Sequence, residues 1–368
     1  MLEPGKISIR QLTVLFYLAM IGDMIIILPP IAAGYAHQNG WIVALASIPM
    51  GMVLVWLMLK LAAHYPDSSL VQICERILGR WLGGLVSVTY LIFFVIAGSI
   101  YVREVGDFLT TQLFANTPIR YIHLLFIATL LWAIWHGLES IARSAELLLP
   151  LFILIYIVLI LCLLPEIEVS RLKPILGEDH LWMLRGTMLT TFYPFGEMIV
   201  FLMVIPYVQH QKHLKRDVLL ASLLAGLTLA LIIFISLTVL GSFFTQHNIY
   251  ATYTLTQKIN IGGFLQRIEA LMAAAWVLTT FLKSCLFFYA FALGTAQLFK
   301  LRSTKPLYVP TTFIIFGLSL LVATDVSYYL NTIVPFWIDW NLTYSLLFPL
   351  LLLAIHHIRN RKKSVLPG

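Results

Sequence analysis

Residues 190–197, with the sequence TTFYPFGE, interrupt an apolar run over residues 181–207 with a proline, a glycine and a carboxylate. Pro194 has no amide hydrogen, and its ring clashes with the preceding helical turn. Gly196 tolerates irregular backbone angles. Hydrocarbon offers no hydrogen bonds to the freed backbone groups, so such a break persists only where it is buried in protein or lines a cavity. With Glu197 beside it, the broken helix predicts a binding site in a transporter-type fold.

The composition indicates an integral membrane protein. Hydrophobic residues make up 60% of the chain and charged residues 11%, whereas soluble domains carry about 25% charge. In a soluble protein the net charge of +7 would suggest nucleic acid. In a chain embedded in the lipid bilayer, the uneven distribution of lysine and arginine among the loops explains this charge better, so we expect no nucleic-acid partner.

About 20 apolar residues are needed to cross the hydrocarbon core of a bilayer. The sequence therefore predicts an all-α protein with ten spans in one transmembrane domain over residues 1–368. The expected spans are 11–35, 40–63, 82–108, 121–137, 144–164, 183–208, 217–241, 264–299, 307–325 and 333–357.

Lysine and arginine are concentrated in the amino-terminal tail, in the loops after even-numbered spans and in a basic tail over residues 358–368. The positive-inside rule then places both termini in the cytoplasm, which agrees with an even number of spans.

The ten spans divide into two sets of five, over residues 11–164 and 183–357. Five is odd, so the second set crosses in the opposite direction, and the fold is a five-plus-five inverted repeat. The first span of each set is interrupted: Gly22 and Asp23 break span 1 ahead of two prolines, and residues 194–197 break span 6. Matching breaks in inverted halves are the best sequence indication of a transporter binding site.

Three ionisable residues fall at mid-depth. Asp23, Glu197 and Lys283 each lie about 20 Å, at 1.5 Å per residue, from the nearest predicted boundaries. A charge there costs at least about 2.5–3.5 kcal/mol, so such residues face the bundle interior. We expect Lys283 to pair with Asp23, Glu197 or both. A purely structural ion pair is the alternative to a functional site.

Span 3 has charges close to its outer end. Arg103 and Asp107 are spaced for a pair along one helix face, and Glu104 lies beside them. A solvated helix end is the preferred interpretation, and a vestibule facing a ligand is the alternative.

Aromatic and polar residues predict features of the outer surface. Trp337 and Trp340 flank Asp339 in span 10, which is typical of an interfacial cap. The outer loops 165–180 and 243–264 are long enough for a gate or a partner contact, with a plain connector as the alternative.

Three segments carry a resemblance to a known family: ISIRQL at 7–12, the break from Ile21 to Pro29, and FYPFGE at 192–197. They resemble the B-subunit family of bacterial spore germinant receptors, and the resemblance covers essentially the whole chain. It implies the fold of amino acid–polyamine–organocation permeases. It also implies a place in the spore inner membrane, with A and C subunits as partners and a small nutrient, such as an amino acid, as ligand.

In that superfamily spans 1, 3, 6, 8 and 10 surround the ligand. The resemblance therefore implies these ligand-binding residues: Gly22, Asp23, Glu104, Pro194, Gly196, Glu197 and Lys283. Many relatives have a small neutral residue where this chain has Asp23, so a relative's ligand preference does not transfer directly. Lys283 lies on the helix that flanks a sodium site in sodium-coupled members, where a fixed ammonium group would replace the ion.

The expected function is a non-enzymatic nutrient-sensing subunit of a germinant receptor. The ligand carboxylate would meet amides near Gly22, and its amine would meet Glu197. The alternatives are a proton- or cation-coupled amino acid transporter acting alone, and an ion or water channel or scaffold subunit. The sequence has no nucleophile–base constellation, phosphate loop or convergent metal ligands, so we expect no enzyme activity, metal or cofactor.

Overall fold

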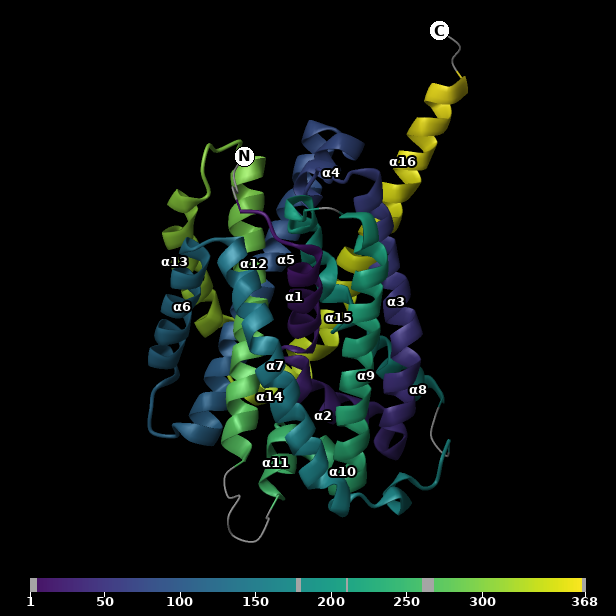
Figure 1. The fold of residues 1–368 in the computed structure, drawn as a ribbon, viewed down its shortest axis with the longest axis vertical. Coiled ribbons are helices and arrows are strands. Elements are labelled where there is room, and N and C mark those ends of the chain that lie inside the picture. Colours follow the sequence, from purple (N-terminus) through teal and green to yellow (C-terminus); the bar gives the residue numbers. More distant parts are fainter. Residues whose placement is uncertain (1–4, 177–179, 210, 260–267, 366–368) are drawn as a thin grey trace.

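A computed structural model describes residues 5–176, 180–209, 211–259 and 268–365. These residues form helices joined by short connections, with one isolated β-bridge and no longer strand. The helices run side by side in a bundle, and both termini lie at the same end of it (Figure 1). The all-α prediction is confirmed.

The helices of the first half follow the predicted spans. In chain order they are α1 (Ile9–Ile21), α2 (Met24–Ala36), η1 (His37–Asn39), α3 (Gly40–His64), α4 (Leu70–Leu78), α5 (Arg80–Phe108), the π-helical η2 (Leu109–Leu113), α6 (Ile119–Trp135) and α7 (Leu138–Leu163). Span 1 is thus α1 and α2 together, and α4 is a short helix between spans 2 and 3.

The second half begins after two 3₁₀ turns, η3 (Leu164–Glu166) and η4 (Val169–Leu172). It comprises α8 (His180–Phe192), η5 (Gly196–Met203), η6 (Ile205–Tyr207), η7 (Gln211–His213), α9 (Leu214–Leu240), α10 (Ser242–His247), α11 (Ala251–Gln257), α12 (Glu269–Leu298), α13 (Lys305–Leu321), α14 (Val326–Tyr328), η8 (Tyr329–Ile333), α15 (Val334–Leu342), η9 (Thr343–Leu347) and α16 (Phe348–Val365). α16 continues into the predicted basic tail.

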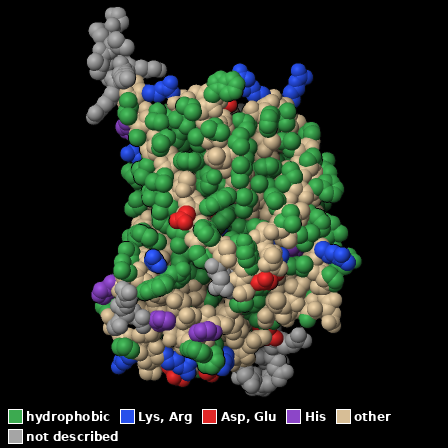
Figure 2. Space-filling model, turned by 180° about the vertical axis from the view of Figure 1, so that it is seen from behind, with side chains coloured by type: hydrophobic (Ala, Val, Ile, Leu, Met, Phe, Trp, Pro, Cys, Tyr) green, Lys and Arg blue, Asp and Glu red, His purple; other side chains and the backbone are tan. Residues whose placement is uncertain are grey.

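Six helical stretches of the described chain are long and apolar enough to cross a bilayer, and the remaining spans are made of shorter pieces. Burial separates interior from peripheral helices. In α12, 72% of the most apolar 18-residue segment is buried inside the protein. In the stretch Leu138–Glu166, which contains α7, the buried share of the corresponding segment is 17%. Figure 2 shows hydrophobic side chains over the middle of one face and Lys and Arg side chains at its two ends. The protein is therefore a multi-pass membrane protein whose periphery faces lipid.

Span 1 begins with a capping box, in which Ser8 and Gln11 bond each other's backbone amides. α1 ends at Gly22, whose backbone leaves helical geometry, and α2 starts after Asp23. Other helices satisfy the carbonyls at this break. Trp276 donates its indole N–H to the Asp23 carbonyl at 3.2 Å, and Thr279 donates its hydroxyl to the Gly22 carbonyl at 3.3 Å. The predicted break is confirmed.

Span 6 is broken where the sequence predicts. α8 ends at Phe192, and the chain passes through a turn at Pro194 into the 3₁₀ helix η5. The Phe195 ring packs on the bare backbone of Gly51 in α3, where a Cβ atom would lie 2.1 Å from its Cγ. Gly196 likewise lets span 10 approach, with Ser345 Oγ 3.0 Å from the place of its missing Cβ.

Span 10 is less regular than the sequence suggests. The helical path starts at Val326, ahead of the expected residue 333, and contains two π-helical segments, η8 and η9. Such segments are rare and occur mostly at functional sites. η9 contacts η5 directly, and η8 reaches the span 6 break through Tyr329, whose hydroxyl lies 3.4 Å from that of Tyr193.

The ends of the bundle are closed differently. At the end that carries the termini, Ile7 pairs with the chain after η5: its amide donates to Tyr207, and its carbonyl accepts from Gln209. At the other end, the predicted loop 243–264 forms α10 and α11, and its residues from 260 on lie outside the described ones. α11 closes onto span 1, because Thr252 donates its hydroxyl to the Ile25 carbonyl at 2.6 Å.

We expect Gly51→Ala to destabilise the protein by about 1–3 kcal/mol, because the added methyl group would overlap the Phe195 ring at the span 6 break. The melting temperature of the purified full-length chain in detergent measures the effect. Gly317→Ala on α13 is the matched control, since no atom lies within 4 Å of the position that its Cβ would take and alanine favours helix. Equal melting temperatures for the two variants would contradict the expectation.

Candidate functional site

Three charged side chains meet at the two helix breaks. The Lys283 ammonium group, from the middle of α12, lies 2.5 Å from Asp23 Oδ1 at the break of span 1. The same group pairs with Glu197 Oε2 on η5. All three side chains are fully buried. Both predicted partners of Lys283 are therefore in contact with it, and one side chain joins spans 1, 6 and 8.

The missing side chain of Gly22 makes room for this arrangement. A Cβ atom there would lie 3.2 Å from Cδ of Lys283, tighter than ordinary van der Waals contact, and 3.1 Å from the Ala19 carbonyl. Gly22 therefore contributes space along the lysine stem. Pro194 and Gly196 contribute by ending α8, so that Glu197 follows directly on non-α backbone.

Aromatic residues surround the charged triad of Asp23, Glu197 and Lys283. Trp337 of α15 donates its indole N–H to Glu197 Oε1 at 2.6 Å. The Lys283 ammonium lies 4.8 Å from the ring centroid of Tyr101 on α5, within the range of a cation–π contact. These contacts bring spans 3 and 10 to the triad, so all five predicted ligand-surrounding spans converge there.

A second polar cluster contains Glu104 of α5. Its Oε1 accepts a hydrogen bond from the hydroxyl of Tyr329 in η8. The Tyr329 hydroxyl also lies 3.4 Å from that of Tyr193, the residue before Pro194. Spans 3, 10 and 6 are thus linked by three side chains, next to the triad but without a direct contact to it among the described pairs.

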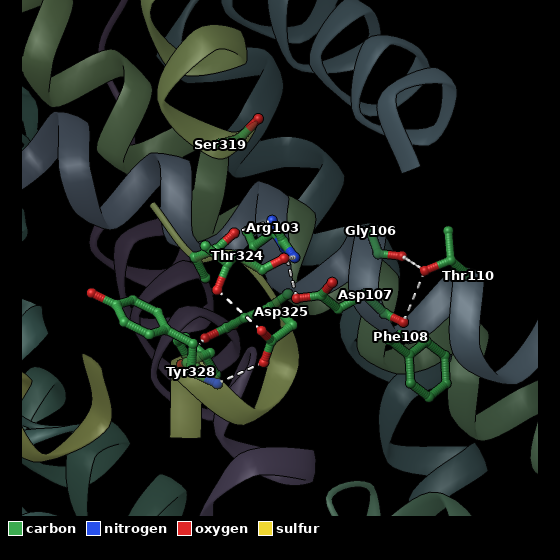
Figure 3. A network of polar contacts seen from close by, with 12 residues as sticks. Arg103, Gly106, Asp107, Phe108, Thr110, Ser319, Thr324, Asp325 and Tyr328 are labelled. Carbon is green, nitrogen blue, oxygen red and sulfur yellow. Dashed lines mark hydrogen bonds and ion pairs between the residues drawn. The ribbon is translucent and has the colours of Figure 1, made fainter. Parts of the chain in front are cut away.

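Figure 3 shows Arg103 facing the connection between spans 9 and 10. Its guanidinium group pairs with Asp107 at 2.8 Å and donates to the carbonyls of Ala323 and Thr324. Arg103, Glu104 and Asp107 are at most 7% exposed. The preferred interpretation of a solvated helix end is therefore wrong, because the start of span 10 covers this part of span 3.

The same connection is held by Asp325, which caps the short helix α14 through the Tyr328 amide at 2.9 Å (Figure 3). The hydrogen bonds from this amide and from the Thr324 hydroxyl hold the pKa of the exposed Asp325 carboxyl below its ordinary value. The carboxylate therefore stays ionised at neutral pH and keeps the start of span 10 in place.

The sequence predicted the triad but not its aromatic partners. We interpreted Trp337 as an interfacial residue, whereas it is buried and bound to Glu197. Asp339, two residues further on, is exposed as expected. Tyr101 lies one turn before Glu104 on the same helix face, a spacing that could have identified it. The contact of Tyr329 with Glu104 could not be predicted from the sequence, because it depends on the π-helical segment η8.

Comparison with known proteins places the chain. The sequence profile of the family described as "Spore germination protein" matches residues 6–326. The chain belongs to this family. It is 32% identical to spore germination protein KB of Bacillus subtilis over 371 aligned residues, covering 99% of this chain and 98% of that protein. Spore germination protein YndE of the same organism is 25% identical, with 82% of this chain and 83% of the relative covered.

Solved transporter structures share the fold. MhsT in complex with L-phenylalanine aligns with a TM-score of 0.66 and 14% identity, over 96% of this chain and 99% of that one. Mhp1, a nucleobase-cation-symport-1 family transporter in a closed conformation with bromovinylhydantoin bound, gives 0.62 and 13%, over 92% and 76%. The predicted permease fold, with five-plus-five spans and breaks in spans 1 and 6, is thus confirmed. The division at residues 164 and 183 stays a prediction.

We expect Lys283→Met to destabilise the protein by about 3–5 kcal/mol, because it leaves two buried carboxylates without their cation. Adding Asp23→Asn and Glu197→Gln should recover part of the loss, since no uncompensated charge of the triad then remains. Thermal melts of the purified variants measure both effects.

Lys60→Met is the control for loss of a lysine, because Lys60 makes a cation–π contact with Trp56 outside the triad. Its effect should stay within about 1 kcal/mol, the usual size of a cation–π contact near the surface. If the triple variant loses as much stability as the three single substitutions together, the pairing of Lys283 with Asp23 and Glu197 is contradicted.

Proposed function

We propose that this protein is the nutrient-sensing subunit of a spore germinant receptor and binds a small zwitterionic nutrient, such as an amino acid, at the two helix breaks. The observation that carries the proposal is the buried triad: two acids and a lysine, each at mid-depth, meet where spans 1 and 6 lose their helical backbone. A structural ion pair alone would not require broken helices. Membership of the spore germination family supports the same conclusion.

The ligand would use both the backbone and the charges of the site. The first amides of α2, after Asp23, have no acceptor within their own helix, and the helix dipole makes this end positive. A ligand carboxylate would bind there. The acidic side of the site suits a ligand ammonium group, because Asp23, Glu197 and Glu104 outnumber Lys283.

Binding would act by shifting the balance between two arrangements of the bundle. A ligand changes such a balance only if it has different affinities for the two states. In the arrangement described here, Lys283 joins spans 1 and 6, and Ile7 joins the amino-terminal segment to the chain after η5. A ligand that competes for Asp23 or Glu197 would favour an arrangement in which these helices separate.

The signal would pass to partner subunits of A and C type in the spore inner membrane, with both termini of this chain in the cytoplasm. The loops 243–264 and 209–216 are the proposed contact surfaces, since they are the most polar connections between spans. This role needs no catalysis, and none is proposed.

We expect Glu197→Gln to lower nutrient sensitivity by about tenfold or more, since it removes the charge that holds the Lys283 ammonium while keeping the size of the side chain. Dose–response germination of spores carrying the variant measures sensitivity, and membrane immunoblots measure abundance. The matched control is Glu75→Gln, a partly exposed acid on α4. Unchanged sensitivity at normal abundance would exclude Glu197 from ligand binding and coupling.

The transporter alternative predicts flux, and the sensor does not require it. We expect proteoliposomes that contain the full-length chain alone to bind amino acid without concentrating it. Uptake of several radiolabelled amino acids, with and without proton and sodium gradients, measures this directly. Concentrative, saturable uptake that Glu197→Gln abolishes would replace the sensor by a coupled transporter. Ion leakage without any ligand would favour a channel subunit.

A further inference from the structure

The buried acids at the centre of the bundle outnumber the buried cations there. Asp23, Glu104 and Glu197 face one lysine, Lys283, and these four side chains are at most 6% exposed. Lys283 is already shared by Asp23 and Glu197. Arg103, the nearest other cation along span 3, is taken by Asp107 and two backbone carbonyls. Glu104 is therefore a buried acid without a cation of its own among the described residues.

One oxygen of Glu104 is also unused. Oε1 accepts from the Tyr329 hydroxyl, whereas Oε2 has no hydrogen-bond partner in the described part of the chain. A buried polar atom without a partner costs about 1–3 kcal/mol, and more for a charged group. Such an atom in a native protein calls for an explanation, for example a water molecule, an ion or a ligand group that satisfies it.

A small cavity adjoins this carboxylate. It has room for about one water molecule. Its lining comes from spans 1, 3, 8 and 10 and from the connection between α10 and α11: Ile27, Glu104, Asp107, Ile249, Tyr250, Trp276, Val326 and Tyr329. The lining therefore combines two carboxylates with aromatic and aliphatic side chains, and one of the two, Asp107, is already paired with Arg103.

We propose that Glu104, enclosed by Tyr250, Trp276 and Tyr329, is the binding site for the ammonium group of the ligand. This inference rests on the proposed function and changes its chemistry: the amine is bound by span 3 and not by Glu197. Both oxygens of Glu197 are already engaged, one with Trp337 and the other with Lys283.

The surroundings favour an alkylammonium group over a metal ion. Divalent cations such as Ca²⁺ take six to eight oxygen ligands in proteins, and Mg²⁺ takes about six. Here the lining holds two carboxylates, of which Asp107 is already paired with Arg103, together with three aromatic residues. Aromatic rings attract organic ammonium groups through cation–π contacts, most strongly where water is excluded. An ammonium group on Glu104 would also reduce the acidic surplus of the centre by one charge.

The position of Glu104 links ligand binding to span 10 and to the break of span 6. Glu104 bonds Tyr329 in the π-helical η8, and Tyr329 lies next to Tyr193 at the break of span 6. The present cavity is too small for a whole amino acid, so the ligand must displace side chains as it binds. Tyr329 on span 10 and Tyr250 on the connection between α10 and α11 are the aromatic lining residues of these two segments.

The test uses the full-length chain in lipid nanodiscs and ethylammonium chloride as the probe. Binding is followed by calorimetry and by the rise in melting temperature. Sodium chloride at equal ionic strength controls for metal cations and salt, and ethanol controls for the uncharged shape. We expect saturable binding of ethylammonium alone, and an increase of about tenfold or more in its dissociation constant in Glu104→Gln. Glu75→Gln on α4 should leave it unchanged.

A second variant covers the case in which Glu104→Gln fails to fold. Glu104→Asp keeps the charge but withdraws it by one methylene, and it should weaken ethylammonium binding while keeping selectivity over sodium and ethanol. Equal binding in wild type and Glu104→Gln, or binding of sodium in place of ethylammonium, would overturn the assignment. If L-alanine or another amino acid binds while Glu104→Gln has no effect, the proposed function survives and the Glu104 site does not. If none of the common amino acids binds to wild type, the proposed function itself fails.

Discussion

The ammonium group of Lys283 joins the two broken helices on which the centre of this protein is built. Backbone that leaves helical geometry inside a bilayer must find hydrogen bonds within the protein. The break in span 1 finds them on α12, through Trp276 and Thr279. Lys283 extends from the same helix to acids at both breaks. α12 is therefore mostly buried, and the spans that contact lipid surround it.

The sequence predicted this centre because its constraints are local. A proline, a glycine and an acid within a 20-residue apolar run have few stable arrangements in hydrocarbon, and the depth of Lys283 follows from counting residues to each boundary. Inverted topology then brings the two breaks together. The spans, their number and the Lys283 contacts could all be derived in this way.

The parts that could not be derived depend on packing between distant segments. Nothing near Tyr329 in the sequence indicates that span 10 passes through a π-helical segment, yet this segment places its hydroxyl on Glu104. Trp337 has the composition of an interfacial residue, and its indole N–H instead finds a buried acceptor on η5. Arg103 and Asp107 look like a solvated pair until the connection between spans 9 and 10 folds over them.

The charged triad and the Glu104 cluster differ in whether their acids already have a cation. This difference suggests which of the two a ligand ammonium group binds first. In the triad each acid already has a cation, so a ligand competes with an existing interaction there. Glu104 Oε2 lacks a hydrogen-bond partner, as does Asp23 Oδ2 in the triad, but Glu104 also has no ion pair among the described residues. A cation therefore gains its interaction at Glu104 without breaking another. A ligand that binds first at Glu104 would lower the negative charge beside the triad and weaken the electrostatic reason for Lys283 to remain between two acids. Because Lys283 holds spans 1 and 6 together, a small change at span 3 would favour their separation, provided the ligand binds the separated state more tightly.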